Sequence, residues 1–360
     1  MTVATSSHVE AVREGRMGVI ALNRPEAINA LSHDMVRAIL GALEGWRDDD
    51  SIRAILFEGR GPRGFCAGGD VRAVRASVLA GRPEAADAFF ADEYRMNALI
   101  AGYGKPVVAI ADGIVMGGGI GIAGHADFRF ATSRASFGMP EAAIGFFGDV
   151  GANAILARAP LHRALALLMT GLPAGAADAL ALGLADCVIA PGQVEEVRRA
   201  VIAAAEAGDV ETAIASLMQA QGVDPGPATL CADADALDEE FTEGDAEAIV
   251  GAVIEAAMAE PHLARYSGAL AQRSPTSLVA IHDSHVAARR LQDVARVLAL
   301  DLDLAGYLCR QPDFAEGVRA VLVDKTGAPR WSPAEFRGVD TAAIAAIVAR
   351  HLEPAIEPAT

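Results

Sequence analysis

Residues 105–122 read KPVVAIADGIVMGGGIGI, and the fold class follows most directly from this stretch. Lys105-Pro106 opens a run of apolar residues that predicts a buried strand over Val107–Ala111. Three glycines then follow Met116, where we expect the chain to turn into a helix. The first N–H groups of a helix lack partners within the helix and carry a positive dipole. The stretch therefore predicts a strand, a glycine loop and a helix start that can face a ligand.

A second glycine loop lies upstream, in Phe65-Cys-Ala-Gly-Gly-Asp70. It follows a predicted buried strand, Ile52–Glu58, and a turn rich in glycine and proline. One N–H group from each loop can bind a single developing oxyanion, and loss of such a donor typically costs roughly 10²–10³ in rate. The alternative is that the glycines only allow tight turns and close packing of helix on strand. Each loop alone favours this alternative, whereas the pair favours an oxyanion site.

The glycines also match a dinucleotide-binding pattern, because Gly119–Gly124 reads GIGIAG after a strand. Such a fingerprint expects an acidic residue at the end of a second strand, about 20 residues further on. Glu141 has this separation, but it follows Pro140 and precedes AAIGFF, so it does not end a strand. We therefore reject a nicotinamide cofactor.

The rest of the chain divides into an α/β part and a helical part. Further strands are predicted at Val9–Val12, Met17–Leu22, Phe128–Ala131 and Cys187–Ala190, and a helix is predicted after the N-cap residue Ser32. This alternation indicates an α/β core over residues 1–200. Residues 201–360 are mostly helical in pattern, without internal repeats. One helix, at 291–308, places these residues on one face: Leu291, Val294, Leu298, Leu302 and Ala305.

Composition excludes several classes of protein. The net charge of −17 over 360 residues argues against nucleic acid or an anionic membrane as partner. The four cysteines are far apart, so we expect reduced thiols and a cytoplasmic location. The N-terminus lacks the apolar segment of a signal peptide, and the most apolar stretch, 107–124, contains Asp112 and many glycines, unlike a membrane span. The eight histidines show no metal-ligand spacing, so no metal is expected.

Four segments together make the sequence similar to the crotonase superfamily of enoyl-CoA hydratases and isomerases: LNRPEAINALS at 22–32, FCAGGD at 65–70, KPVVAIADGIVMGGGIGI at 105–122 and MPEAAIGFF at 139–147. The resemblance implies an α/β fold, a ClpP-like spiral of ββα units, here with a helical C-terminal region. It implies an acyl-CoA substrate and oxyanion N–H groups on Gly69 and Gly118. The residues expected to hold coenzyme A are Arg24, Glu26, Ala27, Ala67, Gly68, Gly69 and Asp70.

Two acids indicate the branch within this superfamily. A hydratase of the family type adds water with two glutamates, one located two positions after the glycine run and one in the Pro-Glu pair. Here Gly121 stands at the first position and Glu141 at the second, so the pair is incomplete. Asp149, within FFGDVG at 146–151, resembles instead an acid of the 3-hydroxyisobutyryl-CoA hydrolases.

This closer resemblance covers most of the chain except residues 195–240. It includes Asp92-Glu93-Tyr94, SPTSL at 274–278, the helix near 291–308 and DFAEGVRAVLVDKTGAPRWSP at 313–333. Gly148 and Ala152 depart from the pattern, because these hydrolases often have proline and glycine there. A glycine in place of proline loosens the loop that presents Asp149. We expect this to affect the rate and the acyl preference more than the reaction type.

The resemblance implies hydrolysis of a short branched 3-hydroxyacyl-CoA thioester, as for 3-hydroxyisobutyryl-CoA in valine catabolism, with no cofactor besides the coenzyme A of the substrate. The C-terminal region, 201–360, would complete the active site. The expected catalytic residues are Glu141, Asp149, Gly69 and Gly118. The expected substrate-binding residues are Glu93, Gly117, Gly118, Glu141 and Asp149.

Simpler explanations exist for three of these acids. Glu141 is a surface acid after a proline turn in the simplest case, Asp149 a helix N-cap, and Glu93 part of a solvated helix face. Asp70 is likewise explained as a cap of the next helix. Two other functions fit the fold, namely a hydratase or isomerase and a non-catalytic acyl-CoA-binding protein. Crotonases commonly form trimers, so a homo-oligomer is also considered.

Overall fold

Two β-sheets form the frame of the structure, a computed structural model that describes residues 7–353. Within these residues, the larger sheet has the strand order β1-β2-β3-β5-β7-β9 and the smaller sheet the order β4-β6-β8. β1 and β2 pair antiparallel, and the other neighbours pair parallel. The strands are β1 (Val9–Glu14), β2 (Met17–Leu22), β3 (Ala54–Gly59), β4 (Gly64–Cys66), β5 (Val107–Ala111), β6 (Ile114–Met116), β7 (Phe128–Thr132), β8 (Ser136–Gly138) and β9 (Cys187–Ile189).

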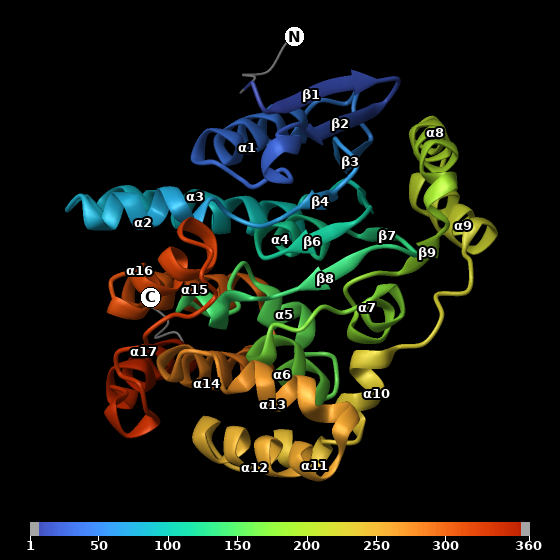
Figure 1. Cartoon of the computed structure of the whole chain (residues 1–360). Coiled ribbons are helices and arrows are strands. Elements are labelled where there is room, and N and C mark those ends of the chain that lie inside the picture. The colour runs from blue at the N-terminus through green and yellow to red at the C-terminus, as the bar shows by residue number, and fades with distance from the viewer. Residues whose placement is uncertain (1–6, 354–360) are drawn as a thin grey trace.

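Successive turns of the chain add one strand to each sheet. β3 and β4, then β5 and β6, then β7 and β8 follow one another in sequence, and each pair contributes its first strand to the larger sheet and its second to the smaller. Helical segments of different lengths follow each pair, so the chain winds as a spiral of ββα units (Figure 1). The expected spiral fold is confirmed. The unequal helical segments explain why the sequence shows no repeat of fixed period.

Eight helices of the first part of the described chain pack around the sheets. They are α1 (His33–Arg47), α2 (Val71–Leu79), α3 (Pro83–Ala101), α4 (Gly118–Ala123), α5 (Ala152–Leu156), α6 (Leu161–Thr170), α7 (Ala176–Leu182) and α8 (Val194–Ala204). α1 shows why these helices form where they do. The Ser32 hydroxyl accepts the N–H of Met35, as the predicted N-cap requires, and the predicted apolar stripe is buried.

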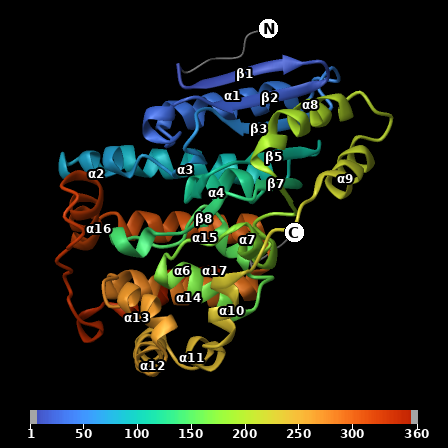
Figure 2. The same cartoon turned by 45° about the vertical axis from the view of Figure 1, so that its right-hand side comes forward.

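The second part of the chain is helical, as expected. Its helices are α9 (Val210–Gln221), α10 (Thr229–Asp235), α11 (Asp238–Thr242), α12 (Ala246–Ala259), α13 (Ala264–Leu270), α14 (Pro275–Leu291), α15 (Val294–Leu308), α16 (Pro312–Val318) and α17 (Thr341–Leu352). α15 packs against α3 and α5 of the first part, and α16 packs against α2. α16, drawn in red, thereby lies next to α2 (Figures 1 and 2). These contacts bring residues after 290 beside the glycine loops.

The larger sheet is buried on both faces, which gives the structure two hydrophobic cores. In β3, Ile55 and Phe57 join the main core with α1 and α3, whereas Ala54 and Leu56 join a second core with α8 and α9. Alternate side chains of a strand point to opposite faces, so a strand covered on both sides is apolar throughout. This explains why the predicted strand Ile52–Glu58 contains a continuous apolar run, although β3 begins at Ala54.

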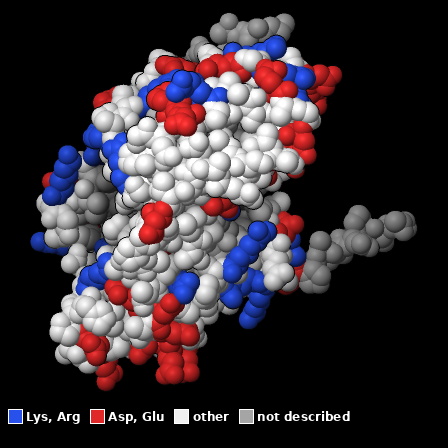
Figure 3. Space-filling model, turned by 90° about the vertical axis from the view of Figure 1, so that its right-hand side faces the viewer, with Lys and Arg blue, Asp and Glu red and all other residues white. Residues whose placement is uncertain are grey.

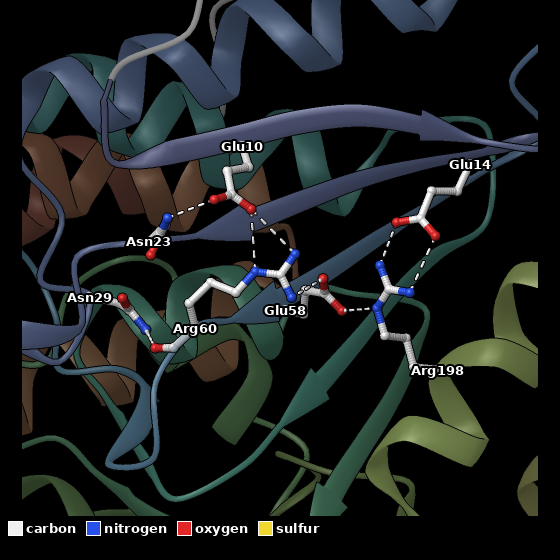
Figure 4. Close-up of polar contacts among 7 residues, drawn as sticks. All are labelled: Glu10, Glu14, Asn23, Asn29, Glu58, Arg60 and Arg198. Carbon is white, nitrogen blue, oxygen red and sulfur yellow. Dashed lines mark hydrogen bonds and ion pairs between the residues drawn. The ribbon is translucent and has the colours of Figure 1, made fainter.

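A network of charged side chains ties α8 to the edge of the larger sheet (Figure 4). Arg198 of α8 contacts Glu14 of β1 and donates to Glu58 of β3 at 2.7 Å. Arg60 contacts Glu58 from the other side at 2.9 Å and also pairs with Glu10. The nearly buried Glu58 carboxylate is thus held between two guanidinium groups, the arrangement that a buried charge requires.

The predicted helix at 291–308 differs from the structure in its start and in its buried face. α14 ends at Leu291, Gln292 adopts a left-handed conformation, and Asp293 caps a new helix, α15. Within α15, Leu298 and Ala305 of the predicted face are buried, whereas Leu302 is exposed. The buried residues of α15 are Val297, Leu298, Leu300, Asp301, Leu304, Ala305 and Leu308. A buried aspartate on this face was not expected.

Acidic side chains gather at the upper and the lower end of the face in Figure 3, and at the upper end basic side chains lie among them. The lower end lies at the level of α10–α12 in Figure 1. α11 begins with Asp238, Glu239 and Glu240. Strands β1 and β2 lie at the opposite end (Figures 1 and 2). Among residues 7–353, no helix is long and apolar enough to cross a membrane.

Candidate active site

The two glycine loops meet at one point of the fold. Gly69 follows β4, and Gly118 begins α4 just after β6, the neighbour of β4 in the smaller sheet. A Cβ atom on Gly118 would lie 3.3 Å from the backbone N of Gly69, so the two loops nearly touch. Within the described residues, neither of these two N–H groups donates to a protein acceptor. Both remain available to a ligand atom placed between the loops.

Glycine is required at these positions because side chains already surround them. A Cβ on Gly118 would lie 2.6 Å from Oε1 of Glu93, and a Cβ on Gly117 would lie 2.8 Å from Oε1 of Glu141. Gly117 also has a φ of +48°, a conformation that L-residues with side chains rarely adopt. The glycine loops therefore bring two carboxyl groups to within contact distance of the backbone.

Glu141 lies in a helical turn directly after β8 and points into the fold. Glu141 is only 9% exposed, and its Oε2 atom has no hydrogen-bond partner among the described residues. A surface acid would be solvated, so this simpler explanation does not hold. A buried carboxyl oxygen without a partner is costly and usually indicates an absent ligand, water or reactant.

Asp149 lies in the loop before α5 and is 6% exposed. Its Oδ2 atom accepts a hydrogen bond from the Tyr94 hydroxyl of α3 at 2.6 Å. The N-cap of α5 is Gly151, so the side chain of Asp149 is not the expected helix cap. Asp149 is instead held by a phenol that reaches it from a helix 55 residues earlier in the chain.

Glu93 is also buried, at 2% exposure, on the inner face of α3. A solvated helix face is therefore wrong for this residue. Its Oε1 atom has no hydrogen-bond partner within residues 7–353 and lies close to the glycine loops. Three carboxyl groups thus approach one another at the same point: Glu93, Glu141 and Asp149.

Burial and mutual repulsion keep these acids from ionising together. Burial and the neighbouring Asp149 raise the pKa of both Glu93 and Glu141 well above ordinary values. Burial also raises the pKa of Asp149, to about 7, while the hydrogen bond from Tyr94 acts in the opposite direction. Near neutral pH the cluster therefore holds both protons and charge, which is what an acid and a base in one site require.

An inner cavity of about 290 Å³ lies in front of the three acids. Its walls are mainly apolar and include Phe89, Phe90 and Phe146 of the first part of the chain. Val321 and Leu322 close it from a π-helical turn, Arg319–Val323, that follows α16. A small apolar group attached to a carbonyl fits such a cavity, with the carbonyl directed at the glycine loops.

An outer cavity of about 510 Å³ continues from the inner one, because both are lined by Ile28, Ala67, Gly69, Val71 and Leu322. The residues expected at coenzyme A lie here, except Gly68, which lines only the inner cavity. The charged residues of the outer cavity are Arg24, Arg63, Arg72, Lys325, Glu26 and Asp70. Four cations and two anions give a locally basic opening in a chain of net charge −17.

The charged residues around the outer cavity also build its shape. Asp70 caps α2 by accepting the N–H of Ala73, as expected, and it additionally pairs with Arg24 at 2.9 Å. Arg63 donates to the carbonyl oxygens of Pro25 and Glu26 at 2.6 Å each. Lys325 is exposed, and the described residues include no hydrogen-bond or ion-pair partner for it.

Position 121, which distinguishes the hydratase pattern, is closed in this structure. A Cβ on Gly121 would lie 2.7 Å from Nδ2 of Asn97 and 2.8 Å from Cβ of Val150. No side chain, least of all a glutamate, fits there without displacing these neighbours. The acid that is missing from α4 is thus excluded by packing as well as by sequence.

Sequence reasoning missed several residues that support the site. Tyr94 was noted only as part of a matching segment, and Asp301 of α15 was not considered. Asp301 accepts the N–H of Gly151 at 2.8 Å, and the carbonyl of Val150 contacts His125 at 2.9 Å. No local pattern indicated Asp301, because its partner Gly151 lies 150 residues earlier in the chain. Within the described residues, no three acidic, histidine or cysteine side chains are arranged so that they could hold a metal ion.

The comparisons with known proteins agree with this geometry. A family model described as enoyl-CoA hydratase/isomerase matches residues 17–348. A relative from Danio rerio, named 3-hydroxyisobutyryl-CoA hydrolase, mitochondrial, is 34% identical over 347 residues, covering 94% of this chain and 88% of the relative. The crystal structure of a carnitinyl-CoA dehydratase from Mycobacterium thermoresistibile has a TM-score of 0.86 at 36% identity and covers 99% of both chains. That of an enoyl-CoA hydratase from Rhodobacter sphaeroides 2.4.1 has a TM-score of 0.85 at 32% identity, covering 95% and 97%.

These comparisons correct one expectation and establish another. The cytoplasmic location is wrong by this evidence, because the hydrolase relative is named as a mitochondrial protein. The four cysteines are free and buried, which is typical of a reducing compartment. Free cysteines do not distinguish one reducing compartment from another, so they gave no reason to choose the cytoplasm. The family model spans most of the chain, and the relative is similar over nearly all of it. The chain therefore belongs to the enoyl-CoA hydratase/isomerase family, the crotonases.

Proposed function

We propose that the protein hydrolyses the thioester of 3-hydroxyisobutyryl-CoA to 3-hydroxyisobutyrate and coenzyme A, a step of valine catabolism. The observation that carries this proposal is the position of Asp149. It lies in the same cavity as Glu141, while position 121 is closed by Asn97 and Val150. The relative named 3-hydroxyisobutyryl-CoA hydrolase supports the same substrate.

In the proposed reaction, the thioester carbonyl oxygen binds to the N–H groups of Gly69 and Gly118. These donors stabilise the negative charge that develops on this oxygen in the transition state. Their lack of other acceptors within the described residues supports this role. Gly117 keeps the backbone close enough for the substrate to reach them, because a side chain there would collide with Glu141.

Glu141 acts on the carbonyl carbon, either by direct attack to give an anhydride or by removing a proton from water. Both routes need its carboxylate form. They also need a neighbouring group that relays a proton between water and the leaving thiolate, which we assign to Asp149. In the net reaction a C–S bond breaks, a C–O bond forms, and a proton from water reaches the thiolate of coenzyme A. The Oε2 atom of Glu141 has no hydrogen-bond partner among the described residues, which supports its reaction with the substrate or with water. The hydrogen bond from the Tyr94 hydroxyl holds Asp149 in place, which supports its role in proton exchange.

The remaining site residues bind the two ends of the substrate. Glu93 accepts the 3-hydroxyl of the acyl group, since its Oε1 atom lies unpaired beside the glycine loops. The phosphates of coenzyme A occupy the outer cavity near Arg24, Arg63 and Lys325, and its pantetheine arm passes Ala67. No further cofactor takes part. The C-terminal region, 201–360, completes the site through Val321 and Leu322.

A hydratase or isomerase is the main alternative, and two similar crystal structures are of a dehydratase and a hydratase. Addition of water by the family type needs a second glutamate from α4. The chain has Gly121 there, without room for a side chain. A non-catalytic binding protein is disfavoured because such a protein has no reason to keep three acids buried in one cavity at a cost in stability.

One assay separates the three functions. The protein is mixed with 3-hydroxyisobutyryl-CoA while free thiol is followed, and with crotonyl-CoA while enoyl absorbance is followed. We expect thiol release from the first and little change with the second. Loss of enoyl absorbance without thiol release would establish a hydratase instead. Binding of both without either reaction would establish a binding protein.

A variant tests the assigned role of Glu141. Glu141→Gln should reduce thiol release by at least about 10³-fold while leaving the affinity for coenzyme A within about twofold, because it removes only the reacting carboxylate. Glu84→Gln, on the exposed side of α3, serves as the matched control and should retain full activity. Retention of most activity by Glu141→Gln would contradict the assignment.

A further inference from the structure

The turn that carries Asp149 has a strained backbone. Val150 has a φ of +55° and Gly151 a φ of +71°, so two successive residues are left-handed. This conformation is a true outlier for a β-branched residue such as valine, and it persists only where the surroundings enforce it. Glycine at 148 also leaves the start of the turn without the rigidity of a proline. Something outside the turn must therefore hold it.

Three side chains hold the backbone of this turn from different elements. Asp301 of α15 accepts the N–H of Gly151 at 2.8 Å, and His125, which follows α4, lies 2.9 Å from the carbonyl oxygen of Val150. Asn153 of α5 donates to the carbonyl oxygen of Gly148 at 2.8 Å. Asp301 is the one of the three that comes from the C-terminal region, 150 residues further along the chain.

Asp301 has features that packing alone does not require. It is 0% exposed on a face of α15 that is otherwise apolar, and its Oδ1 atom has no hydrogen-bond partner among residues 7–353. Burial raises its pKa well above the ordinary value, and the nearby Asp149 raises it further. Burying a leucine at this position would cost less free energy than burying a carboxyl group, so packing does not explain the aspartate.

The groups that face Asp301 favour its neutral form. The charges of Asp149 and Asp301 both raise the pKa of the Tyr94 hydroxyl on α3, and Glu93 of the same helix raises it further. On the side of α4, burial lowers the pKa of His125 to about 4, which leaves it uncharged. Within the described residues, no Arg or Lys pairs with Asp301.

We propose that Asp301 is a positioning residue for the reaction: its carboxyl oxygen holds the N–H of Gly151 and thereby fixes the Val150–Gly151 turn that directs Asp149 into the inner cavity. It acts as a neutral acid that accepts one hydrogen bond, and it does not touch the substrate. This inference rests on the proposed function, in which Asp149 exchanges a proton with the reacting groups. It gives the C-terminal region a direct effect on the geometry of the reaction.

Two variants of similar size separate this role from simple packing. Asp301→Asn keeps an uncharged side-chain oxygen that accepts the N–H of Gly151, whereas Asp301→Leu fills the same space without an acceptor. We expect the leucine variant to lose about 100-fold in kcat, the typical effect of a misplaced reacting group, with KM for the acyl-CoA within about twofold. The asparagine variant should retain kcat within about threefold. Equal losses in both variants, or full activity of the leucine variant, would overturn the proposal.

A spectroscopic measurement makes the result independent of turnover. The titration of Asp149 is followed by NMR in protein labelled with ¹³C at aspartate carboxyl groups, and Asp149→Asn identifies its signal. We expect the titration near pH 7 to persist in Asp301→Asn and to move to higher pH in Asp301→Leu, because a displaced Asp149 loses the Tyr94 hydroxyl. An unchanged titration in the leucine variant would refute the positioning role.

The two measurements also distinguish this inference from the proposed function. Wild-type protein that releases no thiol, but shows the expected shift in Asp301→Leu, refutes the hydrolase function and leaves the role of Asp301 in the turn intact. If the leucine variant does not fold, the asparagine variant decides. A folded Asp301→Asn protein with kcat reduced more than tenfold, or with a displaced Asp149 titration, would refute the neutral acceptor.

Discussion

Replacement of Tyr94 by phenylalanine tests how the protein controls the charge of its acid cluster. The change removes one hydroxyl, which donates to Oδ2 of Asp149 at 2.6 Å, and leaves the ring in contact with Phe90. The hydroxyl stabilises the ionised form of Asp149 and so lowers the pKa of this buried acid. Without it, Asp149 should bind its proton more tightly.

The size of the effect follows from the kind of hydrogen bond that is lost. A hydrogen bond to a charged group is worth about 1.5–3 kcal/mol, and one pKa unit corresponds to about 1.36 kcal/mol. The pKa of Asp149, about 7 in the native protein, should therefore rise by roughly 1–2 units in Tyr94→Phe. Because Asp149 must be ionised to accept a proton in the proposed reaction, kcat should rise with pH, and its midpoint should move to higher pH by the same amount.

The assay is kcat for thiol release between pH 5 and 10, at saturating 3-hydroxyisobutyryl-CoA. Tyr103→Phe is the matched control, since its hydroxyl is also buried and donates to the carbonyl of Leu43 at 2.6 Å, away from the acids. The control should lose some stability but keep the native midpoint. An unchanged midpoint in Tyr94→Phe, or a shift of the same size in Tyr103→Phe, would refute the reasoning.

Three further substitutions test other parts of the structure. Asp149→Asn should be more stable than the native protein at pH 8, by roughly a few degrees in Tm, and the gain should vanish near pH 4. The sign follows because the folded pKa of Asp149 exceeds the unfolded value, so its charge destabilises the fold as pH rises through about 7. Lys325→Ala should raise KM for the acyl-CoA roughly two- to fivefold at low salt but not for the phosphate-free pantetheine thioester, in parallel rate measurements. Arg198→Met should lower the unfolding free energy by about 1.5–3 kcal/mol in urea denaturation, because Glu58 loses one of its two guanidinium partners.

The sequence predicted those parts of the fold that depend on local pattern. The strands at 107–111 and 17–22 were found because their apolar runs are continuous, and α1 because Ser32 and the stripe that follows it satisfy a helix start. The three-residue strands β4, β6 and β8 carry no such signal, since three residues cannot show a period. They are defined by pairing with one another, which depends on the whole spiral.

The site shows the same division between local and distant causes. The glycine loops and the acids at 141 and 149 were identified because each belongs to a recognisable segment. Tyr94 and Asp301 act on Asp149 from 55 and about 150 residues away, so no local pattern indicates them. The predicted helix at 291–308 differs from α15 in its start, because the chain breaks at Gln292 and the new helix is capped by Asp293.

The geometry of the turn at 150 connects two features that the sequence presents as separate. Val150 blocks position 121, since its Cβ would lie 2.8 Å from a Cβ there, and the same residue shares the left-handed turn that follows Asp149. A glutamate on α4 and this conformation of the turn therefore exclude each other. The absence of an acid at 121 is thus linked to the backbone arrangement that presents Asp149. A chain that regained a glutamate at 121 would have to displace Val150, and with it Asp149, so it would not simply gain hydratase activity beside the hydrolase activity.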